Sequence, residues 1–183
     1  MRVFPSKGPA VIQDELQNTY QYFGFQEYPA GQRLAVWQTR AGPQRLVLVS
    51  RDAAIQPHAP CEVDGELVIE SRGPSEPPRR FPLEPGGWRP LHPERPERGC
   101  RYDGGPVVQK VRLQTGRLHL TALADDLGVP LGDDPTPVRI RLRHGERNYC
   151  FTFGGEVTHR SGRRVVARDA PTAQACPSTP LAP

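Results

Sequence analysis

The chain has 183 residues and a formal net charge of +4, with 22 prolines and 18 glycines. This proline content disfavours long helices, and no apolar run is long enough to predict a transmembrane segment. The 24 basic residues are interspersed with acids, so we expect no nucleic-acid partner. The first residues also lack the apolar segment of a secretory signal.

Residues 1–32 form the first predicted unit. Apolar side chains recur there at the spacing of a helix: Ile12, Leu16, Tyr20 and Phe23. This spacing predicts a short amphipathic helix in the N-terminal segment. The alternative is an extended lead-in whose aromatic residues pack against the next unit.

A first β-module is predicted over residues 33–99. Segments rich in strand-forming residues, separated by turn residues, occur at 34–38, 44–50, 66–71 and 80–83. A polar, proline-rich connection then leads out of this module.

A second β-module is predicted over residues 100–177, with 178–183 as a disordered tail. Apolar and polar residues alternate clearly over 138–143, and aromatic residues alternate with polar ones over 147–153. Short strands with regularly spaced turns are typical of a sandwich or a small barrel.

The two modules share a period of about 72 residues, which indicates stacked copies of one structural unit. At this shift, residues 45–48 match residues 117–120, and Phe81 matches Phe153. The sequence therefore predicts an all-β protein that contains two small, mostly antiparallel modules of sandwich or barrel type, arranged as a tandem repeat.

The four cysteines, Cys61, Cys100, Cys150 and Cys176, lack the C-x-x-C spacing of common zinc and redox sites. An even number in a small β-rich chain favours disulfides, and three pairings are possible. We favour Cys61–Cys100 and Cys150–Cys176, because the two cysteines of each pair are then separated by less than one repeat unit. Cys150 alternates with aromatic residues, so a bond to Cys176 would hold the tail across the outer face of the sheet. Free thiols are the alternative.

A row of arginines is the leading candidate for a binding site. Arg139, Arg141 and Arg143 alternate with apolar residues and therefore share the polar face of one strand. Such a row can bind a polyanion, for example a sulfated or uronic glycan. Lys110 and Arg112 are candidates to extend it from another strand. The alternative is an ordinary solvated face.

Other side chains give weaker indications of chemistry. Four aspartates flank one loop, for which we expect a solvated turn instead of a calcium site: Asp125, Asp126, Asp133 and Asp134. Four aromatic residues are candidates for a sugar platform, although such residues more often lie in the core: Trp37, Trp88, Tyr102 and Tyr149. The histidines form no metal-binding or catalytic motif, so we predict no metal, no cofactor and no catalytic residue. A hydrolase would need His119 or His144 to meet Asp125 or Asp126 in a cleft.

Short motifs follow one another in a distinctive order over residues 98–177: Cys100-Arg101-Tyr102, Gly105-Pro106, Gly116-Arg117-Leu118, the strand 138–143, Tyr149-Cys150, Phe153-Gly154-Gly155 and Cys176-Pro177. This order resembles a C-terminal β-rich module of uncharacterised secreted proteins from high-GC Gram-negative bacteria. The resemblance implies an envelope or extracellular setting, as an appendage of a larger protein, and it implies no activity or cofactor.

We therefore expect a non-enzymatic binding or structural module of a bacterial envelope or extracellular protein. Its expected partner is a glycan or another protein chain. A small β-rich hydrolase and a cytosolic interaction domain with free thiols are the alternatives.

Overall fold

The structure, a computed structural model, describes residues 11–13, 20–22, 25–57, 60–71, 77–132, 135–154, 156–160, 162–170 and 176. Its regular elements in this part of the chain are β-strands and two short 3-10 helices, η1 (Pro85–Gly87) and η2 (Pro96–Arg98). The prediction of an all-β protein is therefore confirmed. Neither of these helices is long and apolar enough to cross a membrane.

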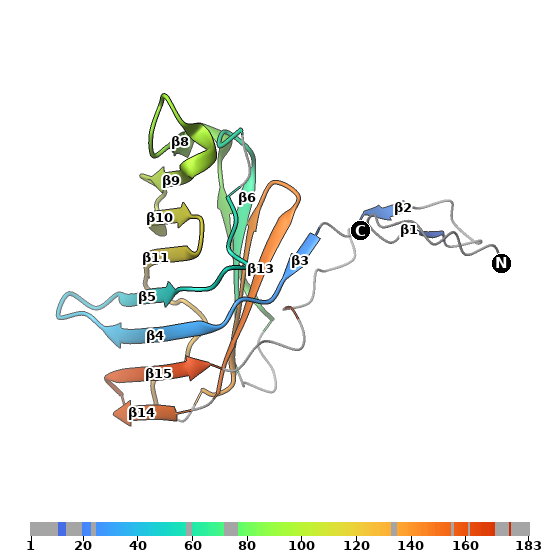
Figure 1. Cartoon of the computed structure of the whole chain (residues 1–183). Helices are drawn as coiled ribbons and strands as arrows, with labels where there is room; N and C mark the ends of the chain where they lie inside the picture. The colour runs from blue at the N-terminus through green and yellow to red at the C-terminus, as the bar shows by residue number, and fades with distance from the viewer. Residues whose placement is uncertain are drawn as a thin grey trace.

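The larger sheet has eight strands in the order β14-β15-β4-β5-β11-β10-β9-β8, and each neighbouring pair is antiparallel. In this order the strands are Glu156–Arg160, Arg164–Ala170, Gly31–Gln38, Gln44–Ser50, Arg117–Ala124, Val108–Gln114, Gly99–Asp103 and Trp88–Pro90. Figure 1 shows these strands stacked one above another along one side of the molecule.

The smaller sheet has five strands in the order β3-β13-β12-β6-β7. In this order they are Phe25–Glu27, Arg147–Phe153, Val138–His144, Gly65–Glu70 and Arg79–Leu83. Strand β3 runs parallel to β13, and the other pairs are antiparallel. β1 (Val11–Gln13) and β2 (Tyr20–Tyr22) pair antiparallel in a separate two-stranded sheet.

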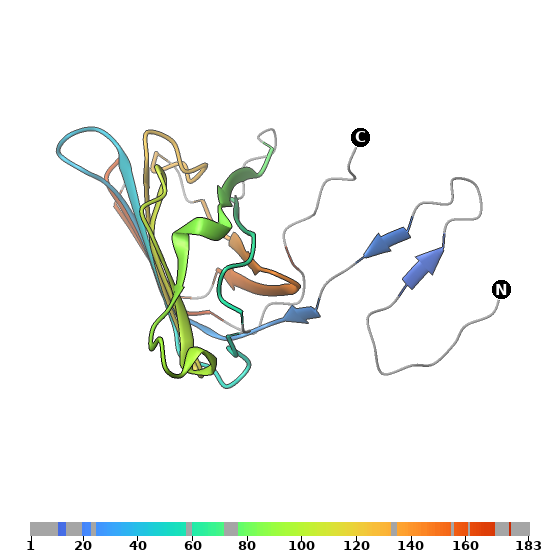
Figure 2. The same cartoon turned by 90° about the horizontal axis from the view of Figure 1, so that it is seen from above.

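The two sheets pack face to face, and their strands cross at a steep angle (Figures 1 and 2). Alternate side chains of both sheets enter one core cluster, in which Leu34 and Leu48 of the larger sheet join Ile140 and Phe151 of the smaller one. Each of these four side chains is 0% exposed. Because period-two alternation leaves every second side chain outside this core, each sheet also presents an outer face.

The predicted N-terminal helix is wrong within the described residues. Residues 11–13 and 20–22 form paired strands, so Ile12 and Tyr20 are in extended backbone and not in a helix. Aromatic residues in alternation, as at Tyr20 and Tyr22, favour a strand, and pairing with a second strand decided between the two periodicities. Leu16 and Phe23 lie outside the described residues.

The predicted division into two separate modules, with a tandem repeat, is not confirmed, because both sheets contain strands from 33–99 and from 100–177. In the larger sheet β5 pairs with β11, where Leu48 is opposite Leu120. In the smaller sheet β6 pairs with β12, where Ile69 is opposite Ile140. The strand order around these central pairs has an approximate two-fold symmetry, in which β4 and β15 correspond to β10 and β9. This symmetry of order does not test the sequence repeat, which stays a prediction.

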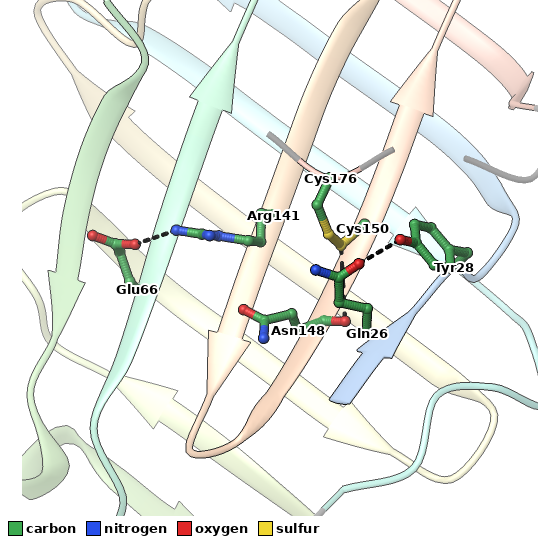
Figure 3. The surroundings of a disulfide bond; sticks show 7 residues. All are labelled: Gln26, Tyr28, Glu66, Arg141, Asn148, Cys150 and Cys176. Atoms are coloured by element: carbon green, nitrogen blue, oxygen red, sulfur yellow. Dashed lines mark hydrogen bonds and ion pairs between the residues drawn. A yellow bond between two sulfur atoms is a disulfide. The ribbon is translucent and has the colours of Figure 1, made fainter. Parts of the chain in front are cut away.

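Both predicted disulfides are confirmed, and the structure contains no free cysteine. Cys61 lies in the loop that leads into β6 and is joined to Cys100 on β9, so this bond holds that loop against the eight-stranded sheet. Cys150 on β13 is joined to Cys176 on the face opposite the core aromatic side chains (Figure 3). The alternative of four free thiols is therefore excluded.

Candidate anion-binding groove

The arginines predicted as an anion site lie on β12, on the outer face of the five-stranded sheet. Each guanidinium is close to a carboxylate: Arg139 to Glu70 at 3.0 Å, Arg141 to Glu66 at 2.7 Å and Arg143 to Asp64 at 2.6 Å. Arg141 is only 4% exposed, and its burial lowers the pKa of its guanidinium, an effect that Glu66 opposes (Figure 3). Acids therefore balance the positive charge of this row, so we do not place an anion site there.

The extension of this row to Lys110 and Arg112 is wrong. Both residues lie on β10 of the eight-stranded sheet, whereas Arg139 lies on β12 of the five-stranded sheet. The side-chain alternation of each strand was correctly interpreted, but alternation does not say which sheet a strand joins.

The groups required for a hydrolase do not converge. His144 is fully buried, and its ring centroid lies 4.3 Å from that of Trp88 in the core. His119 is exposed on the outer face of the eight-stranded sheet. Asp126 forms an ion pair with Arg79 and lies in the loop after β11. Among the described residues, no group of three or more His, Cys, Asp or Glu side chains is placed to hold a metal ion.

Two other predicted features are the acidic loop and the aromatic sugar platform. Asp133 and Asp134 lie outside the described residues, so the structure does not describe the whole acidic loop. Of the aromatic residues proposed as a sugar platform, three are in the core with exposed fractions of 3% or less: Trp88, Tyr102 and Tyr149. Trp37 differs from them, because it is half-buried on the outer face of β4.

The outer face of the eight-stranded sheet carries a large excess of positive charge. Its exposed, outward-facing basic side chains are Arg33, Arg45, Arg89, Arg101, Lys110, Arg112, Arg117, Arg164 and Arg168. Asp103 is the acidic side chain described on this face, and it pairs with Arg101 at 3.4 Å. Glu156 and Arg160 of β14 are outside this comparison, because their side chains are not described.

Strand register brings many of these charges into one row that runs across the strands. Successive strands contribute directly opposed residues, in the order Arg168, Arg33, Val49, His119, Arg112, Arg101 and Arg89. We call this set the cation row. The approximate two-fold symmetry of the strand order relates Arg33 to Arg112 and Arg168 to Arg101. Neighbouring strands are about 4.8 Å apart, so the row extends over roughly 29 Å.

A groove runs beside the cation row. The floor of the groove lies two residues along each strand from the cation row. It is formed by small side chains that lie directly opposite one another on neighbouring strands: Val166, Ala35, Val47 and Thr121. Ala35, Thr121 and Val166 face outward but are only 2%, 6% and 8% exposed, which indicates that longer neighbouring side chains shield them. Two residues further along, Arg164, Trp37 and Arg45 form the opposite wall. The two walls are four residues apart, or about 13 Å.

Two hollows lie along the groove, and both involve β4. A hollow of about 530 Å³ is lined by residues that include Arg33, Ala35, Trp37, Val47 and Arg164. A second hollow of about 160 Å³ continues along the groove and shares Arg33 and Arg164 with the first. Ligand pockets commonly have volumes of about 300–1,000 Å³, so the first hollow has the size of a small-ligand site.

Positive charges on this face of the sheet lie close enough together to affect one another. The pKa of His119 is lowered, first by partial burial and then by the positive charges of Lys110 and Arg112. The guanidinium of Arg45 lies 5.8 Å from the centre of the Trp37 ring, which is a cation–π distance. Like charges placed directly opposite on neighbouring strands destabilise a sheet, and Arg112 opposes Arg101 in this way. An anion bound in the groove would remove this repulsion.

Sequence reasoning missed the groove, although its residues show the alternation of half-buried strands. The outward-facing positions of β4, Arg33, Ala35 and Trp37, alternate with the core positions Leu34 and Val36. This pattern identifies an outer face, but it does not place Arg33 beside Arg168, since that depends on strand order and register.

Comparison with known proteins gives no further indication of function: no protein-family model, no curated protein and no solved structure matches this chain.

Proposed function

We propose that this chain is a non-enzymatic binding module of an exported protein, and that the outer face of its eight-stranded sheet binds an anionic partner. The observation that carries the proposal is the cation row, in which Arg112 opposes Arg101 and Arg33 opposes Arg168. A face under selection for stability alone would place acids between such residues, as the five-stranded sheet does at Arg139 and Glu70.

The chemistry of the side chains supports an anionic partner. Arginine forms bidentate hydrogen bonds with carboxylate, sulfate and phosphate groups, and all the exposed cations described on this face except Lys110 are arginines. A row of like charges also raises the local concentration of an oppositely charged partner and speeds its association.

Two disulfides support the assignment to an exported protein. Such bonds form and persist in oxidising compartments, such as the cell exterior and the bacterial periplasm. The setting that we propose is therefore the bacterial envelope or the extracellular space.

The test is binding of inorganic polyphosphate, a polymer that offers charge without rings, measured as a function of salt. The variant Arg33→Gln/Arg112→Gln removes two charges from the cation row. The matched control, Arg139→Gln/Arg143→Gln, removes two charges from the acid-paired face, so both variants have the same net charge.

We expect Arg33→Gln/Arg112→Gln to bind polyphosphate at least about tenfold more weakly than the parent protein at low salt. The slope of log affinity against log salt concentration should also be smaller in magnitude by roughly 1.5–2. The control should stay within about twofold of the parent protein. Equal losses in the two variants would mean that net charge alone drives binding. No binding by the parent protein at low salt would reject the proposed function.

A further inference from the structure

We infer that the anionic partner is an acidic polysaccharide, which lies across the strands in the groove and places a sugar ring against Trp37. This inference rests on the proposed function and adds the chemical class of the ligand.

The length and symmetry of the cation row indicate a linear ligand. The row continues over neighbouring strands for roughly 29 Å, which exceeds the size of any single small anion. Arg33 and Arg112 take corresponding places on the two sides of the central pair, Val49 and His119. A polymer with a regularly repeated charge can contact both halves of such a row at once.

The cross-section of the groove indicates a ligand with apolar faces as well as charged edges. Ala35 and Val47 form a floor without charge, whereas Arg33 stands on one wall and Arg164 on the other. A pyranose ring that carries a carboxylate or sulfate has this distribution: its C–H faces are apolar and its substituents are anionic. A polymer of phosphate groups alone has no part that matches the floor.

Trp37 strengthens the argument for a ring. Its indole is half-buried and lines the larger of the two hollows, with Arg45 and Arg164 opposite it on the two neighbouring strands. An aromatic side chain with exposed area provides a flat apolar surface, and the flanking guanidinium groups provide forked donors for an acidic substituent. Trp37 and the cation row are part of one site, since Arg33 lines the hollow and also belongs to the row.

The same features argue against a nucleic acid. Proteins that bind single strands stack successive bases on several aromatic side chains. On the described part of this face, Trp37 is the aromatic side chain available, because Trp88 and Tyr102 point into the core. The disulfides also fit a compartment outside the cytosol.

The test compares a soluble polyuronate with polyphosphate and with a single-stranded oligodeoxynucleotide, each of matched charge, at one moderate salt concentration. Two variants change the groove without removing an arginine: Trp37→Ala removes the ring surface, and Ala35→Phe fills the floor. A thermal unfolding curve confirms that each variant is folded, and Trp37→Phe is the conservative replacement.

We expect each of the two groove variants to weaken polyuronate binding by at least about fivefold, which is typical for the loss of one aromatic contact, and to leave polyphosphate binding within about twofold. Trp37→Phe should retain most of the polyuronate affinity. The chain has two tryptophans, and Trp88 is only 1% exposed. Polyuronate should therefore change the fluorescence of the parent protein but not that of Trp37→Phe.

The possible failures are distinguishable. If both polyanions bind but neither variant affects the polyuronate, the inference is overturned and the proposed function stands. Tighter binding of the oligodeoxynucleotide than of the polyuronate overturns the inference in favour of a nucleic acid. If no polyanion binds the parent protein at low salt, the proposed function itself fails.

Discussion

The substitution Arg112→Glu should stabilise the free protein while it removes anion binding. Arg112 lies directly opposite Arg101 on β9 and His119 on β11. A cross-strand pair contributes about 0.2–1 kcal/mol, favourable for opposite charges and unfavourable for like charges. Reversing the charge of Arg112 turns its repulsion with Arg101 into attraction, so the expected gain is about 0.4–2 kcal/mol. For a chain of 183 residues this raises the unfolding temperature by about 1–8 °C.

The matched control is Arg139→Glu on the five-stranded sheet. Arg139 lies opposite Glu70, and their charged atoms are 3.0 Å apart. The substitution replaces an attractive pair with a repulsive one, so the same arithmetic predicts a loss of about 0.4–2 kcal/mol. Both variants place glutamate in the interior of a strand, so the intrinsic strand preference of the residue cancels in the comparison.

The assay is thermal or urea unfolding under non-reducing conditions, at low salt and at about 1 M salt, where charges are screened within about 3 Å. Arg112→Glu should exceed the parent protein in stability at low salt, Arg139→Glu should fall below it, and salt should reduce both differences. Equal destabilisation by the two variants at low salt would refute the reasoning, because it would show that the charges of the cation row are already balanced.

Two further predictions concern pH. The lowered pKa of His119 means that the unfolded chain binds more protons below about pH 6.5. The free protein should therefore lose stability as the pH falls through this range. A bound polyanion should offset the positive charges of Lys110 and Arg112 and so raise the pKa of His119. The protein should therefore bind the polyanion more tightly at pH 5.5 than at pH 7.5. An NMR titration in which the pKa of His119 is unchanged or lower in the complex would contradict this. Burial raises the pKa of Tyr149 to about 12, and its hydroxyl donates a hydrogen bond to the carbonyl oxygen of Gln56 at 2.6 Å. Stability should therefore decline as the pH rises above 10, and Tyr149→Phe should cost about 1 kcal/mol at neutral pH and weaken this alkaline dependence, as measured by urea unfolding.

Much of the local structure could be predicted from residue patterns. Val138, Ile140 and Phe151 lie in the core, as the alternation of their strands indicates. Cys150 lies on the opposite face of its strand and bonds to Cys176, again as predicted. These predictions succeed because the direction of a side chain in a strand depends on backbone geometry that repeats every two residues.

The N-terminal segment shows where pattern reasoning fails. The apolar spacing that includes Ile12 and Tyr20 fits a helix, yet these residues lie in paired strands. A short segment can satisfy both periodicities, and the hydrogen bonds of a partner strand then decide the outcome.

The amino-acid sequence by itself determined that the chain is all-β and which faces of its strands are polar, and it favoured one of three cysteine pairings, which the structure then established. Tertiary structure alone decided what each polar face can do. Arg139 and Arg33 have similar surroundings in the sequence, since each directly precedes a buried apolar residue of its strand, but Arg139 lies opposite Glu70 and Arg33 lies opposite Arg168. The first arrangement neutralises charge and the second accumulates it. The physical reason is that electrostatic energy depends on distance in space, and strand register brings together residues that are far apart along the chain.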